Sequence, residues 1–289
     1  MREDPGVARF SPPTPRSRRL GRELRRLREA RGWNLDAAAT ELHCSISRVS
    51  RIESGEIKAR PGDVMELLHA YGVPFAGEPG ESLLTLARDL RQFGWWQRLD
   101  ALSSRYATYI AYEAEAVELH NFEPTLVPGL LQTEAYAREV NSVGRETNAD
   151  AVEQRVRARM TRQQVLTRRP VPLKLHAIVS EAALRVEVGN PEVVREQLRR
   201  IVEASRYPNV TIQVLTDAAG AYLATCGGFA ILGFEQGDPP LGYIETLAGE
   251  LFLEAPKDID RLNAAYDHLR TRAMSPEESI EFIREKAQQ

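Results

Sequence analysis

The 289-residue chain has few of the residues that support metal, redox or membrane chemistry. Only two cysteines are present, Cys44 and Cys226, far apart and without a CxxC partner. The five histidines are scattered and show no HExxH or other ligand spacing. No apolar run approaches the roughly 20 residues that cross a bilayer, and the first residues lack the apolar stretch of a secretory signal. We therefore expect a cytoplasmic protein with reduced thiols, no metal, no cofactor and no membrane contact.

Motifs of catalysis are also lacking. No GxSxG, Walker loop or GxGxxG occurs, and Gly227-Gly228 before an apolar run is typical of a strand bend. His120 near Glu123, or Glu245 near Glu250, could lie in a cleft, but structural roles are more common for such residues. We expect that the protein is not an enzyme.

Charge is divided unevenly along the chain, although the net formal charge is only −3. Residues 1–60 carry 14 Arg or Lys against 8 Asp or Glu, a net charge of +6, and the remaining residues carry a net −9. Because neutralising phosphates supplies much of the affinity for DNA, a positive front on an acidic body fits a DNA-binding head. Charge alone leaves open a merely solvated, charge-rich surface.

Proline, glycine and apolar periodicity divide the chain into four parts. Residues 1–17 hold four prolines and few apolar residues, which is typical of a disordered arm. Residues 18–72 show helical periodicity, and the Pro- and Gly-rich residues 73–82 are expected to form a linker. Residues 83–289 then form a larger second domain.

The first domain is predicted to be an all-α helix-turn-helix unit. Its core is expected to consist of apolar residues at helical spacing, namely Leu20, Leu24, Leu27, Leu35, Ala38, Ala39, Leu42, Val49, Ile52, Val64, Leu67, Leu68 and Tyr71. Asn34 and Ser45 can cap the second and third helices through their side-chain oxygens. Ala39 provides the small residue that a close helix crossing needs.

The third helix, at about residues 45–54, is expected to enter the major groove of double-stranded DNA. Arginines on its outward side can pair bidentately with guanine, hydroxyls can reach bases or phosphates, and an isoleucine can touch a thymine methyl. Basic residues in the following loop suit phosphate contacts. The predicted DNA-binding residues are Asn34, Ser45, Ile46, Ser47, Arg48, Ser50, Arg51, Lys58 and Arg60.

Residues 20–73 resemble the XRE (Cro/repressor-type) helix-turn-helix family. The most specific part is SISRVSRIESG at 45–55, which matches the family's Ser-x-x-x-hydrophobic-Ser-Arg-hydrophobic-Glu-x-Gly core. Leu35 stands where the family often has a phosphate-contacting Gln, so that contact is either lost or passes to Asn34. The resemblance implies a transcriptional regulator, and the alternative is a helical scaffold that no longer binds DNA.

Strand and helix patterns alternate in the second domain. Helices are expected near 82–98, 100–116, 131–142, 149–168, 191–204, 257–272 and 276–287, and strands near 116–122, 172–179, 209–215, 228–234, 241–246 and 249–254. Turn-like segments, and not helices, join the last four strands. This pattern predicts an α+β domain with a mostly antiparallel sheet.

Two clusters in this domain are candidates for binding. The first is aromatic and could line an effector pocket, although aromatics at helical spacing are usually core residues; it comprises Trp95, Trp96, Tyr106 and Tyr109. The second is a basic stretch of one predicted helix, comprising Arg155, Arg157, Arg159 and Arg162. A solvated helix face is the favoured interpretation of this stretch, and contact with a partner or the DNA backbone is the alternative.

The segment VPGLLQTEAYAR at 127–138, with VRARMTRQQVL and GGFAILGF, resembles a domain of unknown function found behind XRE heads in WhiJ-like actinobacterial regulators. Members of that group are similar to antitoxin-like regulators and are often encoded beside a small acidic protein. The resemblance therefore implies such a partner for this chain, and it names no catalytic residue.

One short recognition helix contacts too few base pairs to be selective in a genome, so a homodimer reading a palindromic operator is expected. We expect a sequence-specific, nucleoid-associated regulator, a repressor, whose second domain dimerises and binds a small-molecule effector or a small acidic protein. An antitoxin-like interaction protein whose main role is to hold its partner is the alternative, and an enzyme tethered to DNA fits less well.

Overall fold

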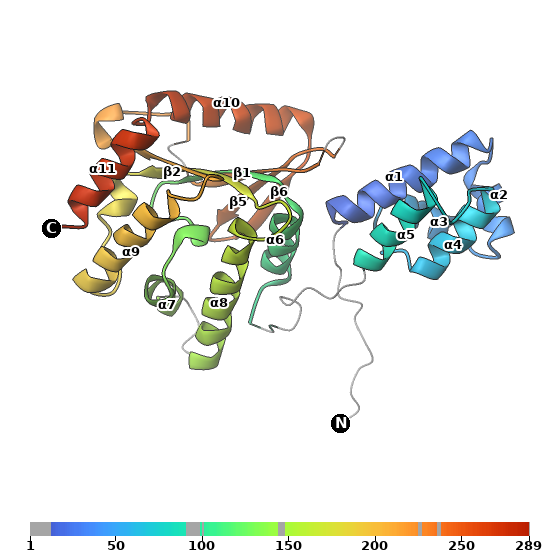
Figure 1. Ribbon diagram of the computed structural model, residues 1–289, viewed down its shortest axis with the longest axis horizontal. Helices are drawn as coiled ribbons and strands as arrows, with labels where there is room; N and C mark the ends of the chain where they lie inside the picture. The colour runs from blue at the N-terminus through green and yellow to red at the C-terminus, as the bar shows by residue number, and fades with distance from the viewer. Residues whose placement is uncertain are drawn as a thin grey trace. The chain divides into compact units, whose positions relative to one another are not determined.

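The computed structural model describes residues 13–90, 99, 101–143, 148–224, 227–235 and 238–288. The chain divides into two compact units after residue 97. The first unit, here called the head, is helical, and the second, the body, combines helices with one sheet (Figure 1). The prediction of an all-α head followed by a larger α+β domain is confirmed.

The described part of the head contains five α-helices: α1 (Pro15–Ala30), α2 (Leu35–Glu41), α3 (Ile46–Glu53), α4 (Pro61–Ala70) and α5 (Gly80–Asp89). The side chains of Thr14, Asn34 and Ser45 each accept a hydrogen bond from a backbone N–H in the first turn of α1, α2 and α3. These caps satisfy N–H groups that have no partner within the helix, and so they fix where each helix begins.

One hydrophobic core holds the head together. Its fully buried members include the predicted Leu20, Leu24, Ala38, Ala39, Val49, Ile52, Val64, Leu67, Leu68 and Tyr71. The predicted Leu27, Leu35 and Leu42 lie half-buried at the margin of this core. The core predicted from helical periodicity is therefore confirmed.

The start of the head differs from the prediction of a disordered arm over residues 1–17. Helix α1 begins at Pro15, because Thr14 caps it and proline suits the first helical position. Thr14 and Ser17 are buried, and the Ser17 hydroxyl donates to the Thr14 carbonyl oxygen at 2.9 Å. Residues 1–12 lie outside the described residues.

The end of the head also lies farther along the chain than the predicted boundary at residue 72. Within the predicted linker, 73–82, the chain folds back so tightly that a Cβ on Gly80 would lie 1.9 Å from the Pro74 carbonyl oxygen. Helix α5 follows at once and packs against α1 and α4. It adds Leu83, Leu84 and Ala87 to the core of the head, and Leu90, the residue that follows it, joins them. The apolar face of α5 therefore belongs to the helical unit.

The body contains α6 (Ser104–Glu115), β1 (Glu118–Glu123), α7 (Glu134–Ser142), α8 (Ala149–Arg162), β2 (Lys174–Ser180), α9 (Pro191–Ala204), β3 (Val210–Leu215), β4 (Phe229–Gly233), β5 (Leu241–Thr246), β6 (Gly249–Leu253), α10 (Pro256–Arg272) and α11 (Pro276–Lys286). Short 3-10 helices lie at Gly129–Leu131, Gln163–Leu166, Ala182–Leu184 and Asp217–Ala219. The strands and helices predicted from residue 116 onward are all present, with small shifts at their ends.

The six strands form one mixed sheet in the order β3-β2-β1-β4-β5-β6. Strands β1, β2 and β3 are parallel, whereas β4 pairs antiparallel with β1, β5 with β4, and β6 with β5. Three of these five pairings are antiparallel, which agrees with the predicted sheet. Although a turn-like segment joins β3 to β4, the two strands are not neighbours, because β3 pairs with β2 at one edge of the sheet and β4 pairs with β1 and β5.

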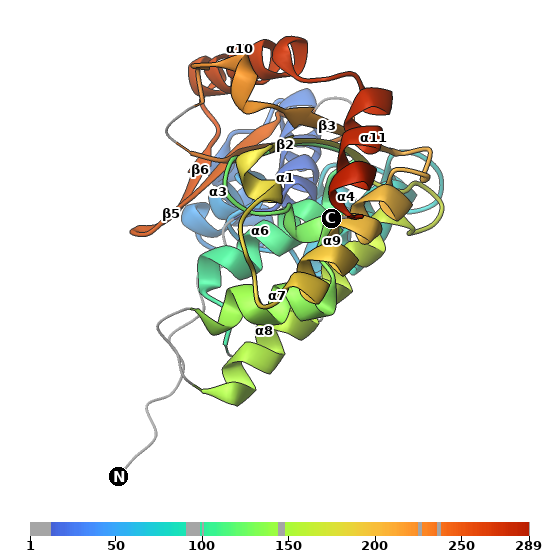
Figure 2. The ribbon, with the colours of Figure 1, turned by 90° about the vertical axis from the view of Figure 1, so that its left-hand side faces the viewer.

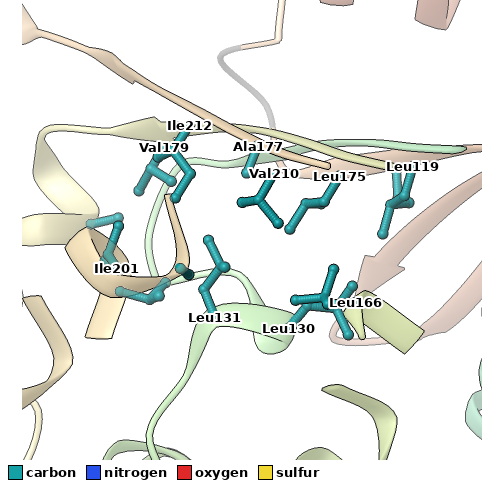
Figure 3. Close-up of a cluster of buried hydrophobic side chains, with 14 of the residues drawn as sticks. Leu119, Leu130, Leu131, Leu166, Leu175, Ala177, Val179, Ile201, Val210 and Ile212 are labelled. Atoms are coloured by element: carbon teal, nitrogen blue, oxygen red, sulfur yellow. The ribbon is translucent and has the colours of Figure 1, made fainter. Parts of the chain in front are cut away.

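Helices cover both faces of this sheet. Helix α10 lies over one face, and α6, α7, α8, α9 and α11 lie over the other (Figures 1 and 2). Side chains of a strand alternate between the faces, so Leu119 of β1 joins the larger core while Phe122 packs beneath α10. In the larger core, strand residues meet Leu130, Leu131, Leu166 and Ile201 from the opposing helical segments (Figure 3).

Candidate nucleic-acid interface

Helix α3 presents one buried and one exposed side. Val49 and Ile52 are 0% and 4% exposed and anchor the helix in the core. The predicted reading residues lie on the other side and are all exposed, namely Ser45, Ile46, Ser47, Arg48, Ser50 and Arg51. Ile46 is 48% exposed, although isoleucine is usually buried. The exposed side of α3 therefore combines hydroxyls, guanidinium groups and one apolar group, which are the chemistries that read base edges.

The position of α3 depends on a close approach to α1 that the sequence analysis does not identify. A Cβ built on Gly21 of α1 would lie 2.3 Å from the carbonyl oxygen of Glu53 and 2.7 Å from that of Ile52. Only glycine therefore allows the two helices to pack at this distance. Gly55, which follows α3, has φ +77°, and a Cβ built on it would lie 2.8 Å from the backbone nitrogen of Arg18.

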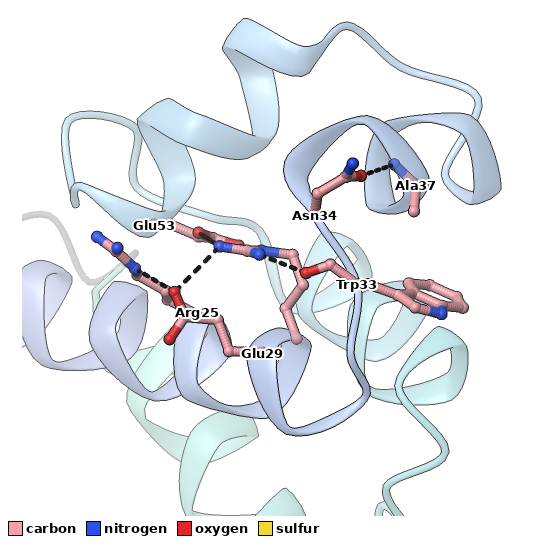
Figure 4. Close-up of polar contacts among 7 residues, drawn as sticks. Arg25, Glu29, Trp33, Asn34, Ala37 and Glu53 are labelled. Carbon is pink, nitrogen blue, oxygen red and sulfur yellow. Dashed lines mark hydrogen bonds and ion pairs between the residues drawn. The ribbon is translucent and has the colours of Figure 1, made fainter.

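A buried ion pair also ties α3 to α1 (Figure 4). The Arg28 guanidinium donates to both carboxylate oxygens of Glu53, at 2.7 and 2.9 Å, and to the Trp33 carbonyl oxygen at 2.7 Å. The Arg28 and Glu53 side chains are only 7% and 6% exposed. Hydrogen bonding to Glu53 raises the pKa of Arg28. A signal for this contact exists in the sequence, because Arg28 continues the inward row of Leu20 and Leu24 at a spacing of four.

Two of the predicted DNA-binding residues have structural roles as helix caps. The Asn34 Oδ1 accepts from the Ala37 amide at 2.8 Å, as Figure 4 shows. The Ser45 hydroxyl accepts from the Arg48 amide at 3.3 Å and lies 3.1 Å from the Ser47 hydroxyl. Both residues are exposed, so capping leaves them accessible.

The two arginines of α3 are held differently. Arg48 forms an ion pair with Asp63 of α4, with 2.9 Å between Nη2 and Oδ1. The Arg51 Nε donates to the Ser47 carbonyl oxygen of its own helix at 3.2 Å. Arg60 is exposed, and its backbone N–H donates to the Asp63 Oδ2 at 3.0 Å. Lys58 is half-buried in the loop between α3 and α4.

Two of the predicted effector-pocket residues, Tyr106 and Tyr109, pack in the core of the body. Tyr109 is 6% exposed, and its ring centroid lies 4.1 Å from that of Tyr243 and 6.3 Å from that of Tyr106. The buried Arg162 guanidinium lies over both the Tyr106 and Tyr109 rings and forms an ion pair with Glu113 at 2.6 Å. The other two residues of that cluster, Trp95 and Trp96, lie outside the described residues. An effector pocket stays a prediction.

The arginines of α8 do not form the solvated face that their spacing predicts. Arg162 is buried, the Arg159 Nη1 donates to the Gln132 Oε1 at 3.0 Å, and the Arg155 Nε donates to the Ala101 carbonyl oxygen at 3.4 Å. Arg157 alone of the four is exposed. The other three arginines of α8 contact groups within the body, because carbonyl oxygens and polar side chains of neighbouring segments face them.

The fold separates one of the two titratable pairs considered for a cleft and brings the other together. His120 and Glu123 lie three residues apart on β1, so strand alternation directs them to opposite faces. Burial raises the pKa of Glu123 to about 7. Glu245 and Glu250 are paired across β5 and β6. Within the described part of the chain, no group of three His, Cys, Asp or Glu residues could hold a metal ion, and no helix is long and apolar enough to cross a membrane.

Comparison with known families supports the division into head and body. Residues 19–78 match the family model of a helix-turn-helix domain. Residues 106–285 match that of a domain of unknown function, DUF5753. Neither a curated protein nor a solved structure matches the chain. The matches confirm the two-part architecture that the sequence motifs indicated, and the first of them supports a DNA-binding regulator of transcription.

Proposed function

The chain belongs to the DUF5753 family and carries a helix-turn-helix domain in front of it, and we propose that it is a sequence-specific transcriptional regulator. The exposed side of α3 carries this proposal. Its arginines, hydroxyls and Ile46 project from a helix that Val49, Ile52 and the Arg28–Glu53 pair fix to the rest of the head. In this proposal the regulator acts in the cytoplasm, on the nucleoid, and represses the genes at its sites.

The regulator acts as a homodimer on a palindromic operator. One α3 of eight residues reaches only a few base pairs, and two-fold symmetry places a second copy about 34 Å, or a multiple of that distance, along the DNA. The head buries its apolar rows in its own core. The body therefore supplies the dimer contacts, and it also binds the effector or the small acidic protein that relieves repression.

Selection from DNA tests this proposal directly. The full-length protein is incubated with randomised duplexes, and bound duplexes are sequenced after several rounds. We expect one enriched, two-fold symmetric sequence, and static light scattering at micromolar concentration should give a dimer. Enrichment of an unsymmetrical sequence by a monomer would refute the dimer, and no enrichment of any sequence would refute sequence-specific binding.

Substitution of Arg51 tests the role of α3 in the same assay. Arg51→Ala should weaken specific binding by about 1–3 kcal/mol and relax the preference at one operator position. Arg157→Ala is the matched control, because it removes an exposed arginine from a helix of the body. Equal binding by wild type and Arg51→Ala would contradict the assignment of α3 as the reading helix.

A further inference from the structure

Asp63 is the one carboxylate that the described contacts place on a guanidinium of the reading side of α3. We infer that Asp63 is a positioning residue that sets the preference of this protein for guanine through Arg48. The inference rests on the proposed function, because it concerns how α3 reads DNA. Asp63 itself touches no base and acts through the guanidinium that it holds.

Asp63 is itself fixed at both carboxylate oxygens. Its Oδ2 accepts the Arg60 backbone N–H at 3.0 Å, which caps α4, and its Oδ1 accepts from the Arg48 Nη2 at 2.9 Å. Helix α4 is anchored in turn by Val64, the next residue, which is 0% exposed. The position of the carboxylate is thus determined by the core of the head, and the side chain is 18% exposed.

Arg48 keeps most of its donors while it is held. A guanidinium carries five N–H groups in a rigid plane, and the Asp63 contact uses one of them. The Arg48 side chain is 48% exposed, so the remaining edge is accessible to the O6 and N7 acceptors of guanine. The carboxylate therefore orders the Arg48 side chain before DNA binds. Ordering a side chain in advance strengthens binding, because less conformational entropy is lost when the complex forms.

Arg51 provides an internal comparison. It lies three residues farther along α3, is exposed, and contacts the Ser47 carbonyl oxygen of its own helix. A substitution of Asp63 should therefore change the base preference at the position read by Arg48 and leave the position read by Arg51 unchanged. If the substitution of Asp63 acted only through the net charge or the stability of the head, it would change the base preference at both operator positions alike.

The size of the effect follows from the cost of ordering one long side chain. That cost corresponds to roughly a 2- to 10-fold change in affinity. Binding to duplexes with guanine at the Arg48 position should fall by this factor when Asp63 is replaced. Binding to duplexes with another base there should change little.

The test uses full-length protein and the randomised duplexes, with the Arg48 position defined as the one that Arg48→Ala relaxes. Asp63→Ala removes the carboxylate, and Asp63→Asn retains an oxygen that can cap α4 at Arg60. Asp36→Asn is the matched control, because it removes the same charge from an exposed residue in the first turn of α2. Thermal unfolding of each variant checks that the head is folded.

We expect both Asp63 variants to lose guanine preference at the Arg48 position alone, and Asp63→Ala to have no further effect when it is combined with Arg48→Ala. Unchanged preference in Asp63→Asn and Asp63→Ala would overturn the inference while leaving the proposed function in place. A stronger guanine preference would also overturn it, because Asp63 would then restrain Arg48 from DNA. An equal change at all positions, matched by Asp36→Asn, would reduce the effect to charge. Failure of the wild type to enrich any sequence would overturn the proposed function and this inference together.

Discussion

Gly21 offers the sharpest test of how the head positions its reading helix. In Gly21→Ala the new Cβ would lie 2.3 Å from the Glu53 carbonyl oxygen, whereas ordinary contacts begin at 3.4 Å. Helices α1 and α3 would therefore have to separate by about 1 Å. Both clashing groups are backbone atoms, so no side-chain rotation relieves the contact. Overpacking of this kind costs typically 1–3 kcal/mol, and the better helix propensity of alanine returns up to about 1 kcal/mol.

We expect Gly21→Ala to lose about 2 kcal/mol of unfolding free energy and to melt roughly 10 °C below the wild type. Specific DNA binding should weaken more than non-specific binding, because base contacts tolerate only a few tenths of an ångström in length. Gly62→Ala in α4 is the matched control, since a Cβ there meets no atom within 4 Å and should leave stability equal or higher. Circular dichroism melts of both variants decide the matter. If the melting temperature of Gly21→Ala equals or exceeds that of Gly62→Ala, the close packing of α1 on α3 does not determine the position of α3.

Three further predictions concern charge. Glu53→Gln leaves the Arg28 charge buried without its partner, so urea unfolding should show a loss of roughly 3 kcal/mol in the free energy of unfolding. Glu29→Gln, at an exposed residue, should change this free energy little, and equal effects of the two substitutions would contradict a structural role for the Arg28–Glu53 pair. The pKa of Glu123 rises on folding from an ordinary 4.5 to about 7, so the folded state binds a proton that the unfolded state has released. The free energy of unfolding should therefore fall by about 3 kcal/mol as pH rises from 4.5 to 7 and then level off. If Glu123→Gln shows the same fall in urea unfolding, the pH dependence does not come from Glu123. Lys58→Ala should weaken binding to all DNA sequences alike and flatten the salt dependence of affinity by roughly one unit, which fluorescence anisotropy at several salt concentrations measures; an unchanged slope would exclude a phosphate contact.

The sequence predicts most of the head because its helices follow local rules. Leu20, Leu24, Val49 and Ile52 repeat at helical spacing, and Ser45 marks the start of α3 by a side chain that caps the next turn. Contacts between segments distant in sequence could not be predicted in this way. The approach of Gly21 to Glu53 depends on two backbones meeting in space, and no local pattern reports it.

In the body, strand positions could be predicted, but strand neighbours could not. Apolar residues mark β3 and a continuous apolar run marks β4, yet turn-like residues between them do not reveal that the chain crosses from one edge of the sheet to the far side of β1. The basic stretch of α8 fails for a related reason. The local sequence predicts that Arg162 is a surface residue. It is buried because Glu113, 49 positions earlier in the sequence, provides a buried carboxylate as its ion-pair partner.

The double duty of residues on α3 limits how the DNA preference of such a protein can evolve. Substitution of Ser45 is restricted, because loss of a helix cap costs about 1 kcal/mol of stability. Substitution of Arg48 would also leave the Asp63 carboxylate without its ion-pair partner. Ile46 and Ser50 are exposed, and within the described part of the chain the Ser50 hydroxyl has no hydrogen bond to maintain. If the protein acts as proposed, we expect substitutions at these two positions to change its DNA preference most readily, because they leave the packing of α3 intact.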